Sequence, residues 1–368
     1  MKRTWLMYLL ATSCISIPVF MSGCQPQASS PSATSSSGPA TNTQAKKSIK
    51  VNPSWLLQGD NAPLTLAIQK GYFGSKGLDV KIERGFGSAD TLAKVASGQF
   101  EIGFGDLYSM IEFNTKNPND QLVAVALPYN KSPFSIVTLK KNNITEPKAL
   151  AGKKLGAPAG DAPRKVFPVL AEQLGMKPDG VEWVTMEPKL REAFLIKGDV
   201  DAVSGFMTTI LPSLAKAGTK AEDITMFSYT DYGLDLYGNA VIVKKSFLKQ
   251  NPDVVKNFLA AYIQGFQDTI KDPTAGLESV VKAGDSLMNA DSEKLRLQIA
   301  LDKLYITPEV DQVGIGGADP ARLEKTIQQV AKGFSLEVPK TDQVFDGSFL
   351  PPKEQRLLPP TADRKPLL

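Results

Sequence analysis

The feature that most constrains the fold of this sequence is an internal repeat of one strand–turn–helix–strand pattern. Residues 50–83 run from a predicted strand through Gly59-Asp60-Asn61-Ala62-Pro63 into a predicted helix, a glycine and a second strand. The same order recurs over residues 154–184, where Gly160-Asp161-Ala162-Pro163 precedes the helix. Because strands that alternate with helices form parallel sheets, one such unit used twice predicts two similar α/β lobes.

A second matched pair follows in register. Residues 95–105 and 195–205 each consist of a predicted helix end, a glycine stop and a short strand that ends in glycine. In open α/β sheets, ligands bind beyond the carboxyl ends of the strands, where helix N-termini also lie. The two pairs together therefore predict a ligand cleft between the lobes.

The N-terminus indicates export. A basic start precedes a largely apolar stretch over residues 5–20, and Met21-Ser22-Gly23-Cys24 places a cysteine after two small residues. This pattern is typical of a secretory signal, and the tetrapeptide resembles a bacterial lipobox, which implies removal of residues 1–23 and a lipid on Cys24. The alternative, ordinary cleavage, would leave Cys24 as an oxidation-prone free thiol. We expect a lipoprotein anchored in the periplasm or at the cell surface.

The next segment is predicted to be a tether. Residues 24–47 hold the lipidated cysteine and a stretch rich in Ser, Thr, Pro, Ala and Gln without apolar periodicity, which cannot bury enough surface to order itself. The folded body is then expected to begin at Ser48. Its length allows two lobes, because single cores stop growing at roughly 250–300 residues.

Composition excludes several kinds of chemistry. The sequence contains no histidine, and its two cysteines lie in the signal and at the lipidation position. A Ser/His/Asp hydrolase, a His-ligated metal and a thiolate nucleophile are therefore excluded, and we expect no catalytic residue, no metal site and no cofactor. Basic and acidic side chains are nearly balanced, 42 against 38, so no nucleic-acid partner is expected.

Several short motifs point to one family. They are residues 67–73 (AIQKGYF), 77–80 (GLDV), 95–98 (VASG), 150–156 (LAGKKLG) and 198–202 (GDVDA), together with Gly87-Ser88. With these motifs, residues 48–350 resemble the type II solute-binding proteins of bacterial ABC importers, in the branch that includes taurine, alkanesulfonate, nitrate and thiamine-pyrimidine binders.

The resemblance implies an α/β fold of two lobes with a ligand cleft between them and two crossing segments. We place the crossings around 128–134 and 237–239. The implied division is lobe 1 at 48–132, lobe 2 at 133–238, a return to lobe 1 at 239–340 and a C-terminal tail at 341–368. The implied partners are a permease and its ATPase subunits, and the implied oligomeric state is a monomer.

Candidate ligand-binding residues follow predicted strands in the first half of the body. Trp55 could stack on a flat ligand or cover the sheet end. Asp60, Asn61 and Asp106 precede helices, so each is either a ligand contact or an N-cap. The complete set here is Trp55, Asp60, Asn61, Gly87, Ser88, Asp106 and Tyr108.

The second half of the body contributes corresponding candidates. Arg164, in the first turn of a predicted helix, is the sharpest anion candidate, because a guanidinium fork suits carboxylate, sulfonate or phosphate; its alternative is a pair with Asp161. The complete set here is Gly160, Asp161, Arg164, Glu187, Phe206 and Thr208, with Tyr237 and Asn239 at the second crossing.

The favoured function is capture of a small solute by lobe closure, without chemistry. The acidic candidates together with the aromatic ones favour a nitrogen heterocycle such as an aminopyrimidine, whereas Arg164 with the helix N-termini favours a sulfonate, nitrate or carboxylate. Two alternatives stay open: a solute-sensing lipoprotein that does not transport, and an enzyme similar to the pyrimidine synthases of thiamine biosynthesis. The synthases use histidine and a cysteine cluster, which this sequence lacks.

Overall fold

The computed structural model describes residues 46–119, 121–286 and 288–368. The predicted signal segment, Cys24 and the tether up to residue 45 lie outside the described residues. Among the described helices, none is long and apolar enough to cross a membrane.

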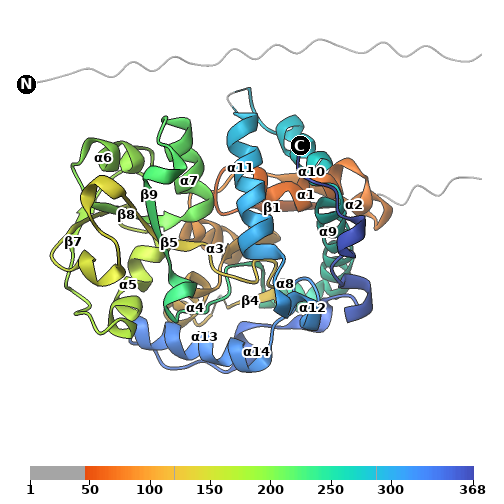
Figure 1. The fold of residues 1–368 in the computed structure, drawn as a ribbon. Helices are drawn as coiled ribbons and strands as arrows, with labels where there is room; N and C mark the ends of the chain where they lie inside the picture. Colours follow the sequence, from red (N-terminus) through yellow and green to blue (C-terminus); the bar gives the residue numbers. More distant parts are fainter. Residues whose placement is uncertain (1–45, 120, 287) are drawn as a thin grey trace, which may run out of the picture. The chain divides into compact units, whose positions relative to one another are not determined.

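Two five-stranded mixed sheets form the centres of two lobes (Figure 1). The first sheet has the order β2-β1-β3-β10-β4, in which β1 is parallel to β2 and β3, and β10 is antiparallel to both of its neighbours. Its strands are β1 (Lys47–Asn52), β2 (Leu78–Ile82), β3 (Ile102–Asp106), β4 (Leu122–Ala126) and β10 (Asn239–Lys244).

The second sheet repeats this arrangement. Its order is β7-β6-β8-β5-β9, with β6 parallel to β7 and β8, and β5 antiparallel to β8 and β9. In each sheet the antiparallel strand is the first strand after the chain enters that lobe or returns to it. The strands are β5 (Phe134–Leu139), β6 (Lys154–Ala157), β7 (Glu182–Thr185), β8 (Ala202–Phe206) and β9 (Ile224–Ser228). The predicted two-lobed α/β fold is confirmed.

Helices cover both sheets, and their bounds reproduce the internal repeat of the sequence. The helix after β1 and the helix after β6 occupy matching places between parallel strands, as the sequence predicted. The first lobe carries α1 (Ala62–Gln69), α2 (Tyr72–Ser75), α3 (Ser88–Ala96), α4 (Leu107–Lys116), α8 (Lys245–Gln250), α9 (Pro252–Lys271), α10 (Pro273–Ala283), α11 (Ala290–Ala300), α12 (Pro308–Val313), α13 (Pro320–Gly333) and α14 (Thr341–Val344), and the second lobe carries α5 (Ala162–Gln173), α6 (Arg191–Lys197) and α7 (Met207–Lys216).

The chain changes sheets twice, between Ala126 and Phe134 and between Ser228 and Asn239. These segments contain the stretches where crossings were predicted, whereas the lobe boundaries at single-residue precision stay predictions. One buried apolar cluster runs from α3 and α4 through both crossing segments to α5 and α13. The two lobes therefore share a packed core on the side of the crossings.

The residues before the prolines of α9 and α13 differ in their capping role. Asp319 caps α13, because its carboxylate accepts the Arg322 main-chain N–H at 2.8 Å. Asn251 does not cap α9, since that helix has no side-chain cap and the Asn251 amide donates to the Phe247 carbonyl. The reason is that α8 ends directly before α9, so this side chain serves the end of the preceding helix.

The tail packs on the first lobe. The Lys365 main-chain N–H donates to the Lys271 carbonyl at 2.8 Å, and the Lys365 ammonium pairs with Asp272 at 2.6 Å. The main-chain N–H of Leu368 donates to Thr274 Oγ1 at 3.1 Å. The last residues are thereby attached to α9 and α10.

Candidate functional site

A cavity of about 1090 Å³ lies between the two lobes. Its wall comes from the loops after β1 and β2, from the N-termini of α3 and α5, from α6 and α7, and from Arg296 on α11. Of the predicted ligand-binding residues, twelve line it: Trp55, Asp60, Asn61, Gly87, Ser88, Asp106, Gly160, Asp161, Glu187, Phe206, Thr208 and Asn239.

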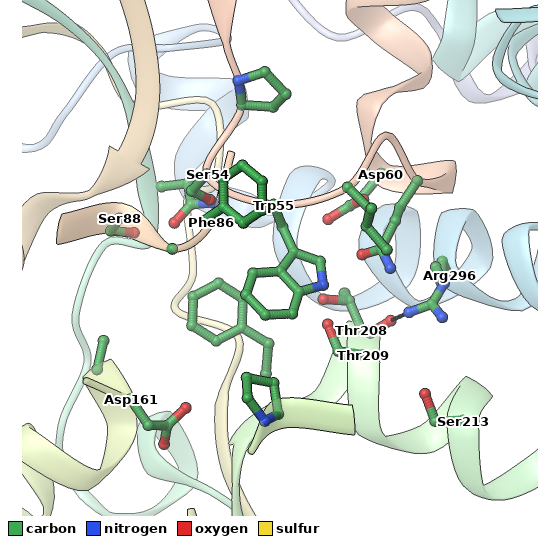
Figure 2. Close-up of a pocket in the computed structure, with 18 of the residues that line it drawn as sticks. Ser54, Trp55, Asp60, Phe86, Ser88, Asp161, Thr208, Thr209, Ser213 and Arg296 are labelled. Carbon is green, nitrogen blue, oxygen red and sulfur yellow. Dashed lines mark hydrogen bonds between the residues drawn. The ribbon is translucent and has the colours of Figure 1, made fainter. Parts of the chain in front are cut away.

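Trp55 occupies the middle of this cavity. Figure 2 shows its indole between the side that carries Ser54 and Ser88 and the side that carries Thr208 and Arg296. Phe206, from the second lobe, lines the same space. A flat ligand can therefore meet aromatic side chains of both lobes.

Three carboxyl groups line the cavity: Asp60 and Asp161 are partly exposed, and Asp106 is fully buried. Asp60 accepts a hydrogen bond from the Tyr129 hydroxyl at 2.5 Å, and Asp161 accepts one from the Ser204 hydroxyl at 2.5 Å. Asp106 accepts from the main-chain N–H and the hydroxyl of Ser109.

Burial raises the pKa of each of these three carboxyls, and the hydrogen bonds offset part of that effect. Asp161 and Asp106 also cap α5 and α4, so the capping alternative and cavity lining hold together for both. Asp60 is no cap. Asp60 and Asp161 are partly exposed, so a ligand N–H can reach these two acceptors from the cavity, whereas Asp106 is fully buried.

The predicted anion candidate, Arg164, lies outside the cavity. Its guanidinium donates to Thr185 Oγ1 at 2.9 Å and lies over the Trp183 ring at 5.0 Å from the centroid. The alternative side-chain pair with Asp161 is also absent, because only the Arg164 main-chain N–H reaches that carboxylate, at 3.2 Å. The guanidinium is engaged along the edge of the second sheet.

Two predicted tyrosines contact each other outside the cavity: Tyr108 on α4 and Tyr237 in the second crossing segment, where a polar cluster lies. The buried Tyr108 hydroxyl donates to the Tyr237 carbonyl, and the Tyr237 hydroxyl donates to Glu309 at 2.6 Å. Neither tyrosine lines the cavity. We call this group the hinge cluster and define it as Asn130, Asp235, Tyr237, Glu309 and Arg322.

Arg322 is the centre of the hinge cluster. It forms ion pairs with Glu309 at 2.9 Å and with Asp235 at 3.0 Å. It also donates to the main-chain carbonyl of Asn130 at 2.7 Å and lies over the Tyr237 ring. Because Asn130 is in the first crossing segment and Tyr237 in the second, one side chain on α13 joins both.

Arg296 is a cavity residue that the sequence interpretation missed. It is 7% exposed and pairs with Glu293 on its own helix at 3.2 Å. Its Nη1 donates to the Thr208 carbonyl of the second lobe at 2.8 Å (Figure 2). Arg296 therefore ties α11 of the first lobe to α7 of the second across the cavity wall.

Aromatic and polar neighbours were missed as well. Phe86 lines the cavity and is 65% exposed, and Tyr262 of α9 is buried and also lines the cavity. The other lining residues absent from the predictions include Ser54, Tyr129, Arg191 and Thr209. In the described part of the chain, no group of three or more Cys, Asp or Glu side chains could hold a metal ion.

Comparisons with known proteins agree with this architecture. The formylaminopyrimidine-binding protein of Halalkalibacterium halodurans is 24% identical over 306 residues, which cover 82% of this chain and 89% of that protein. The 4-amino-5-hydroxymethyl-2-methylpyrimidine phosphate synthase THI13 of Saccharomyces cerevisiae is 27% identical over 250 residues, 65% of this chain and 72% of that protein.

Solved structures establish the fold. The aliphatic sulphonate binding protein SsuA of Escherichia coli matches with a TM-score of 0.61 at 15% identity, over 86% of this chain and 93% of that chain. The zinc-bound ligand-binding component of an ABC-type import system from Staphylococcus aureus matches with a TM-score of 0.64 at 15% identity, over 84% and 100%. The fold is that of the periplasmic binding proteins. The model of the family described as NMT1/THI5 like matches residues 58–276, more than half of the sequence, and the chain therefore belongs to this family.

Proposed function

We propose that this protein is the extracytoplasmic solute-binding component of an ABC importer and that its solute is an aminopyrimidine-like nitrogen heterocycle. The solute enters the cavity, contacts both lobes and stabilises a closed form that a permease with its ATPase subunits recognises. In this proposal the protein acts as a monomer held at the membrane by a lipid on Cys24.

One observation carries the choice of ligand class. The cavity is lined by three partly or fully buried carboxyls, Asp60, Asp106 and Asp161, and by the Trp55 indole. The strongest anion candidate, Arg164, is engaged outside it. The buried cations in the wall have acidic partners, Arg191 with Glu192 at 2.7 Å and Arg296 with Glu293. This arrangement favours a flat donor of N–H groups over a sulfonate or nitrate.

The comparisons support the same class, because one relative is named for binding a formylaminopyrimidine. Other relatives are named as pyrimidine synthases. This sequence contains no histidine, so imidazole-dependent chemistry is not open to it. We therefore favour binding and release of the pyrimidine without reaction.

Thermal unfolding of the purified protein tests the proposal. We expect aminopyrimidines and formylaminopyrimidines to stabilise it, by about 2.7 kcal/mol at a hundred times the dissociation constant, and taurine, alkanesulfonates and nitrate to have no effect. Selective stabilisation by a sulfonate would reject the ligand class. A protein that responds to none of these solutes would contradict the proposal as a whole.

Trp55→Ala provides the matched variant. Loss of a stacked indole is expected to weaken pyrimidine binding about tenfold, measured by titration calorimetry. Trp183→Ala is the control, because Trp183 packs against Phe167 outside the cavity and should reduce stability while leaving the dissociation constant within about twofold. Equal losses of affinity in both variants would show that Trp55 has no specific contact with the ligand.

A further inference from the structure

A buried hydrogen-bond acceptor in the cavity wall has no partner. Asn239 is the first residue of β10, in register with Asp106 on β3, and is 7% exposed. Its amide nitrogen donates to Ser54 Oγ at 3.5 Å, whereas Oδ1 makes no hydrogen bond. Because an unpaired buried acceptor destabilises a fold, each one in a native protein calls for an explanation.

The neighbouring polar atoms are paired. The Asp106 carboxylate accepts from Ser109, and the Asp106 main-chain N–H donates to Ser88 Oγ at 3.1 Å. Within the described residues, the other buried side-chain atoms without partners are Thr326 Oγ1 and Gln329 Oε1 on α13, and neither lines the cavity. Of these three unpaired atoms, Asn239 Oδ1 is therefore the one whose residue lines the cavity.

Asn52, a second buried asparagine of the same lobe, has a structural role and serves as a comparison. Asn52, at the end of β1, is fully buried and does not line the cavity. Its amide nitrogen donates to the carbonyls of Glu83 and Arg84, and its oxygen accepts from Thr91 at 2.5 Å. Asn52 is satisfied without a ligand, whereas Asn239 is not.

We propose that Asn239 Oδ1 accepts a hydrogen bond from an N–H group of the bound solute and thereby selects heterocycles that carry an exocyclic amino group. This inference rests on the proposed function. It assigns Asn239 as a specificity-determining residue: a ring with hydrogen or methyl in place of the amino group leaves the acceptor unpaired in a closed cavity, and the protein discriminates against it.

The test pairs two variants with two probes. Calorimetric titrations compare 4-amino-5-hydroxymethyl-2-methylpyrimidine with its analogue that lacks the 4-amino group, using wild type, Asn239→Leu and Asn239→Asp. We expect wild type to favour the amino probe at least about tenfold. Asn239→Leu should lose this preference and bind the analogue within about twofold of wild type. Asn239→Asp, which keeps an acceptor, should retain the preference. An unchanged preference in Asn239→Leu would overturn the inference.

A stability measurement keeps the two proposals distinguishable. Without ligand, Asn239→Leu should unfold at or above the wild-type temperature, because it removes an unpaired acceptor, whereas Asn52→Leu should unfold well below it. An Asn239→Leu variant as unstable as Asn52→Leu would show that Asn239 is structural and overturn the inference. If wild type binds neither probe, the proposed function fails for this ligand class, and the stability comparison alone still decides whether the Asn239 acceptor is unpaired.

Discussion

The hinge cluster and the three carboxyls of the cleft, Asp60, Asp106 and Asp161, are both largely buried polar groups. They differ in the partners that offset the cost of burying them. In the hinge cluster, Arg322 has two carboxylate partners and main-chain acceptors in both crossing segments. In the cleft, Asp60, Asp106 and Asp161 accept from neutral hydroxyl or main-chain donors, and burial raises their pKa values.

This difference separates two roles. A buried charge with an ion-pair partner and hydrogen bonds is complete within the fold, whereas a buried carboxyl that makes no direct ion pair retains the capacity to bind a cationic group. Substitutions in the hinge cluster should therefore change stability first, and substitutions in the cleft should change ligand binding or its pH dependence. Three predictions test the distinction.

The largest effect is expected for Arg322→Ala. Removing the guanidinium leaves the Glu309 carboxylate without its cation and the carbonyls of both crossing segments without this donor, so we expect the free energy of unfolding to fall by about 3 kcal/mol. Denaturant unfolding measures this loss. Lys220→Ala is the control, because its pair with Glu222 is exposed and long, 3.8 Å, and should contribute less than about 0.5 kcal/mol. Similar losses in both variants would show that the hinge cluster contributes no more to stability than an exposed ion pair does.

An intermediate effect is expected for Tyr237→Phe. The lost hydroxyl donates to Glu309 and accepts the Asp319 main-chain N–H at 2.8 Å, so the variant should lose about 1–2 kcal/mol of stability. Tyr108→Phe removes a single donor to a carbonyl and should lose less. Because neither side chain lines the cavity, pyrimidine affinity should stay within about threefold of wild type. A large loss of affinity with unchanged stability would show that Tyr237 acts in ligand binding and not in the stability of the hinge cluster.

The smallest effect is a change of slope for Asp60→Asn. Burial raises the folded-state pKa of Asp60 above its ordinary value of 3.8, so the folded protein keeps this proton to higher pH than the unfolded chain does. The resulting stability is present below the ordinary pKa and is lost as pH rises through the raised pKa. The asparagine still accepts from Tyr129 but does not titrate. Relative to wild type, the variant should therefore gain stability as pH rises from about 4 towards neutral.

Unfolding free energies of wild type and Asp60→Asn at a series of pH values between 4 and 8 measure this slope. A constant difference would show that Asp60 titrates normally in the folded state. The same carboxyls need to be ionised to attract a cationic solute most strongly, so pyrimidine affinity should depend on pH in wild type and less so in the variant.

The architecture was predictable because the internal repeat consists of signals that lie close together in the sequence. Each half contains its own strand, turn, helix and glycine signals, and residues at strand ends such as Trp55, Asp106 and Asp161 reach the cleft through the topology alone. The direction of a long side chain does not follow from topology. Arg164 lies in the first turn of α5, whose N-terminus lines the cavity, yet its guanidinium contacts Thr185 and Trp183.

Arg296 was missed for a related reason. In sequence, Glu293 and Arg296 form an (i, i+3) charged pair, which is typical of a solvated helix face. Only the packing of α11 against the second lobe makes the pair buried and places it beside Asp60. Contacts between elements so distant in sequence leave no periodic pattern, and no property of residues 290–300 alone indicated them.

The tie between Arg296 and the second lobe has a consequence for how the binding site can diversify. The acceptor at position 208 is the main-chain carbonyl, which any residue supplies, so the side chain of Thr208 can change without removing the link between the lobes. Asp60, Trp55 and Arg296 belong to the first lobe and its return segment. Variation in ligand preference can therefore accumulate on α7 while the geometry that brings the lobes together is inherited unchanged.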